Sequence, residues 1–305
     1  MEKLFIIGGF GFIGKNLIIN LISEYDIVVV DRKLEQCFKS QYPKLKFYAC
    51  DLINDNNIEE ILYKESPQYI INLVSIVTAE RNIDMFDDMI NINLKVLLKL
   101  YNASKNLKSL KLFLHFGSGE EYGNIKSPFY EIDRENPNSP YALCKQITTN
   151  TAIMLHQNFE FPITVVRPGN LFGQYQEESK FIPYIINQLM NNNTIITTPG
   201  EQKRDFIYVN DFAKGIKLML RNSRNFIGEI VNLSSGDSVT LKKLMEFCKR
   251  YINSDSVIDF GGIPYRENEI MDFKLDISKF KDNIDEKFSV DIFMGLIDYI
   301  ESKRF

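Results

Sequence analysis

The chain begins with a short apolar run, residues 3–7, that leads directly into a glycine-rich turn and then into a helical pattern. Strand, glycine turn and helix in this order bring backbone N–H groups and a helix N-terminus to one place, where the pyrophosphate of a dinucleotide can bind. The turn, GGFGFIG, spaces its glycines as G-x-x-G-x-x-G, and a plain tight turn is the alternative explanation for such a run. The residues that we expect to bind the cofactor here are Gly8, Gly11, Phe12, Ile13 and Gly14.

A carboxylate ends the second predicted strand, residues 26–30, about twenty residues after the middle glycine. At that position Asp31 can accept hydrogen bonds from the adenosine ribose and would repel a 2′-phosphate, which favours NAD over NADP. Arg32 follows directly and offers a positive charge to such a phosphate, and Asp31 is alternatively a plain turn residue. A third strand leads to Asp51 and Leu52, which we place beside the adenine.

Strands and helices alternate through the first part of the chain. Predicted strands at residues 45–50 and 69–75 are separated and followed by helical stretches at 58–64 and about 84–106. This alternation specifies an α/β fold, a Rossmann-type, doubly wound parallel sheet with right-handed crossovers. Asn93, inside the long helical stretch, either braces the loop of the site or is solvated.

A serine follows the apolar strand at residues 110–116, so Ser118 falls where a buried parallel strand ends and its loop begins. Ligands bind at such strand ends in open α/β sheets. Downstream, the Ser-Pro pair at residues 139–140 predicts a helix N-cap followed by the first residue of the helix. Tyr141 and Lys145 then share one face of that helix, about a turn apart.

An ammonium so close to a phenol gives the pair a chemical use. The cation favours the phenolate, so we expect Lys145 to lower the pKa of Tyr141 from about 10 towards the working pH. A tyrosine with such a pKa can give or take the proton of a sugar or alcohol oxygen. A surface helix is the alternative explanation, because the spacing recurs; only this pair follows a strand, a serine loop and a helix cap in that order. The other occurrences are Tyr42/Lys46, Tyr101/Lys105, Tyr122/Lys126 and Tyr299/Lys303.

After residue 167 the pattern changes, and a second, smaller lobe is predicted to lie over the strand ends. A loop of glycines and a proline, residues 167–173, presents Asn170 to a ligand. Arg204 and Arg266 lie in later polar loops, where each is either a phosphate ligand or part of a surface ion pair.

Charge and composition argue against other classes of function. The net charge of -4 and a pI of about 5.5 give no electrostatic reason to bind nucleic acid. The four cysteines form no C-x-x-C pair and no signal peptide precedes the first strand, so we expect reduced thiols and a cytoplasmic protein. The apolar runs are too short to span a membrane, and two scattered histidines, His115 and His156, predict no metal site.

Taken together, the motifs resemble the extended short-chain dehydrogenase/reductases, in particular the NAD-dependent epimerase/dehydratase family that acts on nucleotide sugars. They run in family order over nearly the whole chain. The matching pieces are GGFGFIG with Asp31, Asp51-Leu52, the Ser118 loop, Tyr141-x-x-x-Lys145, RPGNLFG, RDFIYVND, NLSSG and PYREN.

We divide the chain on this basis into two parts. Residues 1–167 form the dinucleotide-binding (Rossmann) domain, to which 206–234 return, and the remainder forms a smaller α/β lobe for a nucleotide sugar. That lobe consists of residues 168–205 and 235–305. The resemblance also implies a homodimer, joined through a four-helix bundle of the helices near residues 84–106 and 140–157.

The resemblance implies a role for each candidate residue. Tyr141 would be the acid/base, Lys145 would lower its pKa and hold the nicotinamide ribose, and Ser118 would bind the sugar oxygen that is oxidised or reduced. The glycine turn and Asp31 would bind NAD. The residues implied for binding the nucleotide diphosphate are Asn170, Arg204 and Arg266.

Several reactions stay open. The 4,6-dehydratases that the chain resembles most often carry Asp-Glu after the serine or threonine; here these positions are Gly119 and Glu120, which weakens dehydration but leaves Glu120 a catalytic candidate. The GSGEEYG loop looks most like that of 4-keto-6-deoxy-sugar nucleotide reductases, although such enzymes commonly use NADPH. We therefore expect an NAD(P)-dependent oxidoreductase acting at C4 of a nucleotide sugar, by 4-ketoreduction of a (deoxy)sugar or by the reverse C4 oxidation. The alternatives are a C4-epimerase, then a 4,6-dehydratase, and remotely a non-catalytic dinucleotide sensor.

Overall fold

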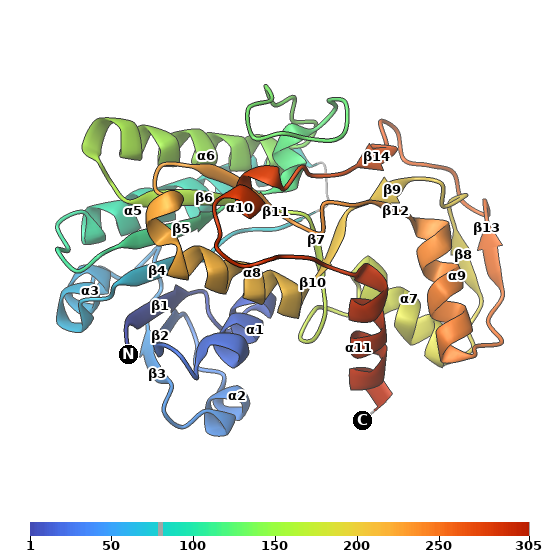
Figure 1. Cartoon of the computed structure of the whole chain (residues 1–305), viewed down its shortest axis with the longest axis horizontal. Helices are drawn as coiled ribbons and strands as arrows, with labels where there is room; N and C mark the ends of the chain where they lie inside the picture. The colour runs from blue at the N-terminus through green and yellow to red at the C-terminus, as the bar shows by residue number, and fades with distance from the viewer. Residues whose placement is uncertain (79–81, 305) are drawn as a thin grey trace.

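The computed structural model describes residues 1–78 and 82–304, and its centre is a seven-stranded parallel sheet (Figure 1). The strand order is β11-β6-β5-β4-β1-β2-β3, which confirms the predicted Rossmann-type fold. The order reverses between β1 and β4, and ligands of open sheets bind beyond the carboxyl ends of the strands at such a point. The strands are β1 (Lys3–Ile7), β2 (Asp26–Asp31), β3 (Lys46–Ala49), β4 (Tyr69–Asn72), β5 (Leu112–Phe116), β6 (Ile163–Pro168) and β11 (Ile230–Leu233).

Strand β1 shows why this sheet needs helices on both faces. Leu4 and Ile6 pack on one face and Phe5 and Ile7 on the other, and all four side chains are buried. The first face is covered by α1 (Phe12–Leu21) and α8 (Val209–Arg221), and the second by α3 (Ile58–Glu65), α5 (Lys95–Ser104) and α6 (Pro140–Phe159).

The helical stretch predicted near residues 84–106 is interrupted in the structure. Its parts are η1 (Ile83–Met85), α4 (Phe86–Met89), the π-helical turn η2 (Ile90–Leu94) and then α5. Such π turns occur frequently at functional sites. This one contains the buried Asn93, whose Oδ1 accepts a hydrogen bond from the backbone of Ile76 at 2.9 Å. Asn93 therefore braces the segment after β4, the first of its two predicted alternatives.

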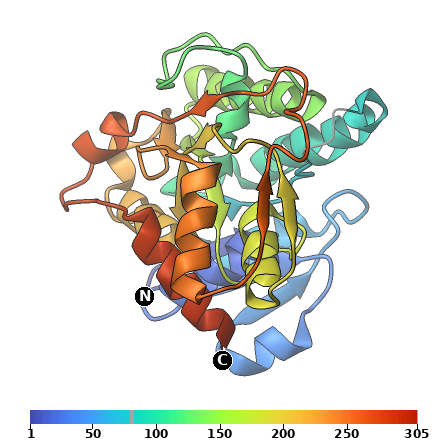
Figure 2. The ribbon, with the colours of Figure 1, turned by 90° about the vertical axis from the view of Figure 1, so that its right-hand side faces the viewer.

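The remaining elements form short sheets and helices with a hydrophobic core of their own, drawn to the right in Figure 1 and facing the viewer in Figure 2. No helix in the described ranges is long and apolar enough to cross a bilayer. The division of the chain into two lobes at residues 167, 206 and 234 stays a prediction. The strands are β7 (Asn170–Phe172), β8 (Ile195–Thr197), β9 (Lys203–Arg204), β10 (Phe206–Tyr208), β12 (Val239–Thr240), β13 (Ile258–Phe260) and β14 (Asp272–Phe273). The helices are α7 (Phe181–Met190), α9 (Leu241–Ile252) and α11 (Ile292–Arg304), and shorter helices elsewhere are α2 (Gln36–Gln41), η3 (Gly119–Tyr122), η4 (Ser223–Asn225) and α10 (Ser278–Asp282).

A late segment of the chain returns to the loop that follows β5, and we call residues 272–277 the strap. The backbone of Phe129, in that loop, donates to Lys274 O at 2.8 Å and accepts from the backbone of Asp276 at 2.9 Å. Asp205 also holds the strap, because its Oδ2 accepts a hydrogen bond from the backbone of Leu275 at 3.2 Å. Figure 1 shows the strap, from β14 towards α10, beside this loop.

Candidate active site

The glycine turn is closely packed and leaves no room for side chains. Gly8 has a φ of +76°, which favours glycine, and its N–H donates to Val30 O at 2.8 Å. A Cβ on Gly14 would lie 2.4 Å from the backbone oxygen of Gly9, so this residue must also be glycine. Helix α1 begins at Phe12 with Gly11 as N-cap and without a side-chain cap, so the backbone N–H groups of its first turn, including those of Phe12 and Ile13, face outward for an anion.

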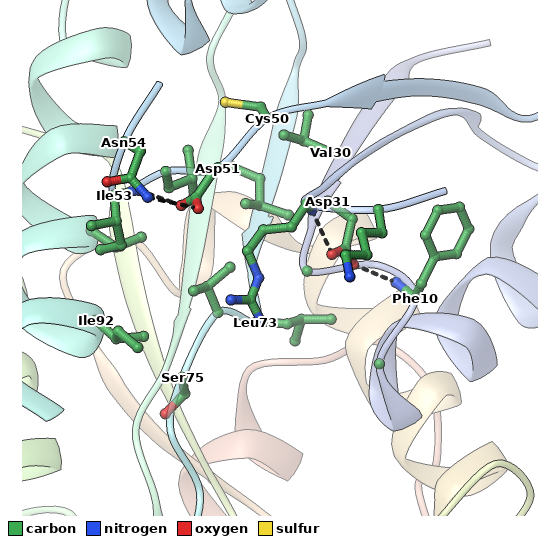
Figure 3. A pocket seen from close by; sticks show the side chains of 18 of the residues that line it. Phe10, Val30, Asp31, Cys50, Asp51, Ile53, Asn54, Leu73, Ser75 and Ile92 are labelled. Carbon is green, nitrogen blue, oxygen red and sulfur yellow. Dashed lines mark hydrogen bonds between the residues drawn. The ribbon is translucent and has the colours of Figure 1, made fainter. Parts of the chain in front are cut away.

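A cavity of about 700 Å³ opens beside this turn, at the reversal of strand order between β1 and β4 (Figure 3). Gly8 and Gly11 line it on one side, and the segment after β4, from Leu73 to Ile76, lines it on another. Such a hollow, walled by glycine backbone on one side and carboxylates on another, fits the adenosine and pyrophosphate of a dinucleotide.

Two carboxylates face this cavity from neighbouring strand ends (Figure 3). Asp31 accepts from the backbone of Phe10 at 3.0 Å and from that of Arg32 at 2.7 Å, so it also fixes the glycine turn. Asp51 accepts from the backbone of Ile53 at 2.9 Å, and this hydrogen bond is the main cause that lowers its pKa. A 2′-phosphate here would meet the negative charges of both carboxylates, although Arg32 and Lys33, with Glu35, also line the cavity.

Ser118 and Tyr141 come together at the carboxyl end of β5. Ser139 caps α6 as predicted, its hydroxyl accepting from the backbone of Ala142 at 3.1 Å. Tyr141 is 7 % exposed, and its phenol lies within hydrogen-bonding reach of the Ser118 hydroxyl. The Nζ of Lys145, one turn further, donates to Phe116 O at 2.7 Å and is buried. The structure thus gathers the three residues at one strand end, as their order in the sequence predicts.

The pKa of Tyr141 differs from the prediction. Burial raises it, and the nearby carboxylates of Glu120 and Glu121 raise it further, whereas the Ser118 hydroxyl opposes the rise. Lys145 does not offset this, because its ammonium is directed to the Phe116 carbonyl rather than to the phenol. Burial instead lowers the pKa of Lys145 to about 8. Perturbed groups of this kind gather at functional sites.

His115 and Glu120 flank the three residues. His115 is buried in β5, and its Nδ1 lies 3.3 Å from Asn72 Nδ2. Burial, with a further contribution from Lys145, lowers the pKa of His115 to about 3, so the imidazole is neutral. Glu120 is partly exposed and its backbone donates to Ser118 Oγ at 3.1 Å.

Gly119 is enclosed by the strap. A Cβ at this position would lie 2.6 Å from Cζ of Phe273 and 3.1 Å from the backbone oxygen of Pro168. The ring of Phe273 is itself buried, so it cannot turn into solvent. The 4,6-dehydratases that the chain resembles most often carry an aspartate at this position. In this protein an aspartate would not fit without rearrangement of the strap.

The candidate phosphate ligands lie in the smaller sheets. The side-chain amide of Asn170 donates to Asp205 O at 3.1 Å, which ties β7 to the turn before β10. Arg204 forms an ion pair with Glu269 and donates to Ile270 O at 2.6 Å. Arg266 is exposed in the loop that leads into β14, the strand that pairs with β9. The structure thus brings Arg204 close to the segment that carries Arg266.

Two residues that the sequence analysis missed support the Ser118 loop. Glu121 and Arg167 are fully buried and form an ion pair. The doubled glutamate after Ser118 and the arginine at the end of β6 were visible in the sequence, but their separation of 46 positions hid the pairing. No group of three or more histidine, cysteine or acidic side chains in the described part of the chain is placed to hold a metal ion.

The glycine turn, the doubly wound sheet and the Ser-Tyr-Lys constellation at the end of β5 define an extended short-chain dehydrogenase/reductase. A sequence model of the NAD dependent epimerase/dehydratase family matches residues 4–234, and the chain belongs to this family. NAD is the cofactor of the family, and the glycine turn and the cavity described above fit it.

The names of individual relatives point to more than one reaction. The chain is 27% identical over 290 residues to a putative UDP-glucose 4-epimerase of Methanocaldococcus jannaschii, covering 90% of each chain. It is 26% identical over 276 residues to the dTDP-D-glucose 4,6-dehydratase of Dictyostelium discoideum, covering 83% of this chain but only 62% of that longer protein. Among solved structures, the UDP-N-acetylglucosamine 4-epimerase of Methanobrevibacter ruminantium M1, in complex with UDP-N-acetylmuramic acid, has a TM-score of 0.88 and 25% identity, covering 100% of this chain and 99% of that one.

Proposed function

We propose that this protein interconverts the C4 epimers of a nucleotide-activated sugar, with NAD held in the cavity beside the glycine turn. The observation that carries the proposal is the meeting of the Ser118 hydroxyl and the Tyr141 phenol at the end of β5, two strands from the glycine turn. The names of two relatives that cover nearly the whole chain, both 4-epimerases, support this reaction over the 4-ketoreduction expected from the sequence.

Tyr141 and Ser118 have separate roles in the proposed reaction. Tyr141, as the phenolate, takes the proton of the C4 hydroxyl, and Ser118 donates a hydrogen bond to the same oxygen. NAD, held by the glycine turn and Asp31, would supply a reversible two-electron oxidant for C4, so that this carbon could be restored with either configuration. Tyr141 then returns the proton to the C4 oxygen, so atoms and electrons balance without net oxidation. Burial raises the pKa of Tyr141, and the Lys145 ammonium, which is directed to the Phe116 carbonyl, does not offset this rise, so the proposed role requires a lower Tyr141 pKa in the complex with NAD and sugar.

The smaller sheets would bind the nucleotide diphosphate. We propose Asn170, Arg204 and Arg266 as its ligands, since Arg204 and the segment of Arg266 lie together. For Arg204 this requires that the diphosphate competes with the carboxylate of Glu269, its present partner. A guanidinium binds both groups through the same pair of N–H donors.

Loss of water across C5–C6 is less well supported than epimerisation. It calls for an acid and a base beside Tyr141. In the loop after Ser118, Glu120 is partly exposed, whereas Glu121 is buried in an ion pair with Arg167. Position 119 carries no carboxyl group, and the ring of Phe273 fills the space that a side chain there would take.

Product analysis tests the proposal. Purified protein is incubated with catalytic NAD and, in separate reactions, UDP-glucose, UDP-N-acetylglucosamine, UDP-glucuronic acid and dTDP-glucose, and products are identified by proton NMR. The expected result is a C4 epimer from one of these probes, with no net change in reduced cofactor. A 4-keto-6-deoxy product would assign a dehydratase instead. Stoichiometric oxidation of NADH or NADPH by a 4-keto nucleotide sugar, without epimer formation, would assign a reductase.

We also propose that two copies pair through α5 and α6 and that the protein works in the cytoplasm. One face of α6 presents Leu143, Ile147 and Met154, of which Leu143 is 40 % and Met154 39 % exposed. Apolar side chains in one stripe are typical of a helix that packs against another helix. The four cysteines are free, in keeping with a reducing compartment. Light scattering of the native protein and of Met154→Glu would test the dimer, which should dissociate in the variant.

A further inference from the structure

A buried carboxylate lies directly beneath the Ser-Tyr-Lys constellation. Glu121 belongs to η3, the short turn that follows Ser118, and its side chain is 0 % exposed. Its Oε1 accepts from the backbone N–H of Ser118 at 2.7 Å. Its Oε2 accepts from Nε of Arg167 at 2.9 Å and lies 2.7 Å from Nη2 of the same guanidinium. One carboxylate therefore joins the loop of Ser118 to the end of β6.

The space around this carboxylate is fully used. A Cβ added to Gly117 would lie 2.4 Å from Oε1 of Glu121, so the glycine before Ser118 is required by the glutamate itself. On the other side, the guanidinium of Arg167 lies 4.6 Å above the ring centroid of Tyr122 and also pairs with Glu135. The position of the Ser118 backbone thus depends on a side chain three residues later that has little freedom to move.

Stability alone does not account for such a buried ion pair. Removing two charges from water costs several kcal/mol per ion, and well-packed apolar residues often serve the fold at least as well. An apolar residue at position 121 would, however, leave the N–H of Ser118 without an acceptor in the interior. The arrangement is therefore better explained by what it holds, which is the loop that carries the serine.

The charge of Glu121 also reaches the other two members of the constellation. It acts against burial in raising the pKa of Lys145, and it adds to the rise in the pKa of Tyr141. Lys145 is faced by Glu121 from η3 and by His115 from β5, with Tyr141 and Cys144 on its own helix. Arg167 from β6 and Glu135 complete the charged groups around the carboxylate.

We propose that Glu121 is the positioning residue of Ser118, Tyr141 and Lys145: it fixes the Ser118 loop through one carboxylate oxygen, is itself fixed by Arg167 through the other, and presents its negative charge to the Lys145 ammonium. This inference rests on the proposed function, because it concerns the same site. Glu121 contacts neither substrate nor cofactor in this proposal and acts only through Ser118, Tyr141 and Lys145.

The test compares Glu121→Gln with Glu135→Gln, since both variants remove one carboxylate partner of Arg167 and only the first contacts Ser118. In the NAD-saturated enzyme, Glu121→Gln should lower kcat by about tenfold to a hundredfold while KM and NAD affinity stay unchanged, as expected for a displaced catalytic group. Its pH profile should move to lower pH, because both pKa values that Glu121 raises will fall. Glu135→Gln should keep the native kcat and pH profile.

Two outcomes would overturn the inference. One is a native kcat and pH profile in Glu121→Gln, and the other is the same fall and shift in Glu135→Gln. If Glu121→Gln does not fold, Glu121→Asp provides the test. Aspartate keeps the negative charge but has a shorter side chain, so kcat should fall while the pH profile stays in place. An unchanged kcat in Glu121→Asp would also count against a positioning role.

A readout without turnover separates this inference from the proposed function. The pKa of Lys145 can be followed by NMR in protein labelled with carbon-13 lysine, the resonance being assigned by its loss in Lys145→Met. We expect it near the value of about 8 given by the structure, and lower in Glu121→Gln. A wild-type protein that turns over none of the probes would count against the proposed epimerase alone. An identical Lys145 pKa in both proteins would count against the action of Glu121.

Discussion

The ammonium of Lys145 donates to the carbonyl oxygen of Phe116, two residues before Ser118, so the lysine is tied to the end of β5 rather than to the phenol on its own helix. The amine of Lys145 is consequently buried at the end of β5. We expect the ammonium to be available there to a ribose hydroxyl of the cofactor.

The titration of Lys145 should be visible in the stability of the protein. Its pKa in the folded state, about 8, lies below the ordinary value of 10.5, so between these values the unfolded chain binds more protons and stability rises with pH. Relative to Lys145→Met, the native protein should gain about 2–3 kcal/mol across this window. Urea denaturation of both proteins at several pH values measures the difference. A difference that is flat from pH 8 to 10.5 would contradict the shifted pKa.

Replacement of the Tyr141 phenol should separate binding from chemistry. Tyr141→Phe keeps the ring in its buried site but removes the proton that moves to and from the C4 oxygen, so turnover should fall by about a hundredfold or more. Calorimetric titration with NAD should give the native affinity. Tyr101→Phe is the matched control, because it belongs to another Tyr-x-x-x-Lys pair in α5. Undiminished turnover in Tyr141→Phe would reject the assigned role.

Asp31 should set the choice between NAD and NADP. In Asp31→Ala the carboxylate that faces the ribose is gone, so the affinity for NADP should rise relative to that for NAD. The affinity for NAD itself should also fall, because the backbone of Phe10 in the glycine turn loses its acceptor. Dissociation constants of NAD and NADP for the native protein and the variant measure these effects. An unchanged ratio would remove Asp31 from the ribose site.

The contact between Gly119 and Phe273 predicts a compensating pair of substitutions. Gly119→Asp should destabilise the protein by about 1–3 kcal/mol, as overpacking of a closed site does. Phe273→Ala alone should also destabilise it, because a buried ring is lost. Combined, the two changes should cost less than the sum of their separate effects, since the space vacated by the ring accepts the new side chain. Additive losses in urea denaturation would show that the two positions do not meet.

The sequence predicted those parts of the site that depend on local patterns and on parallel strand ends. Gly8 and Ser118 come just after buried strands and Asp31 ends another, so the three residues had to lie at one edge of the sheet. The cap before Tyr141 fixed the start of α6 in the same way. Each of these inferences needed only a few neighbouring residues and the rule that strands of one sheet end together.

What the sequence did not predict depends on burial and on partners far along the chain. The spacing of Tyr141 and Lys145 is correct, but the directions in which their pKa values shift follow from burial and from the charge of Glu121, which the spacing does not reveal. Arg204 is an expected cation whose present partner, Glu269, lies in a segment brought back only by the fold. The π turn at Asn93 was hidden too, because the pattern of apolar residues continues through it as in an ordinary helix.

The strap adds a consequence for how such a chain can be shortened. The family match ends at residue 234, where every member of the Ser-Tyr-Lys constellation has already been supplied, yet Phe273 and Leu275 come later and close over Gly119. A fragment that stops at residue 234 would keep the Ser-Tyr-Lys constellation but lose Phe273 and Leu275, which pack over Gly119. The strap thus helps to enclose the site, as do the strands that carry the reactive residues.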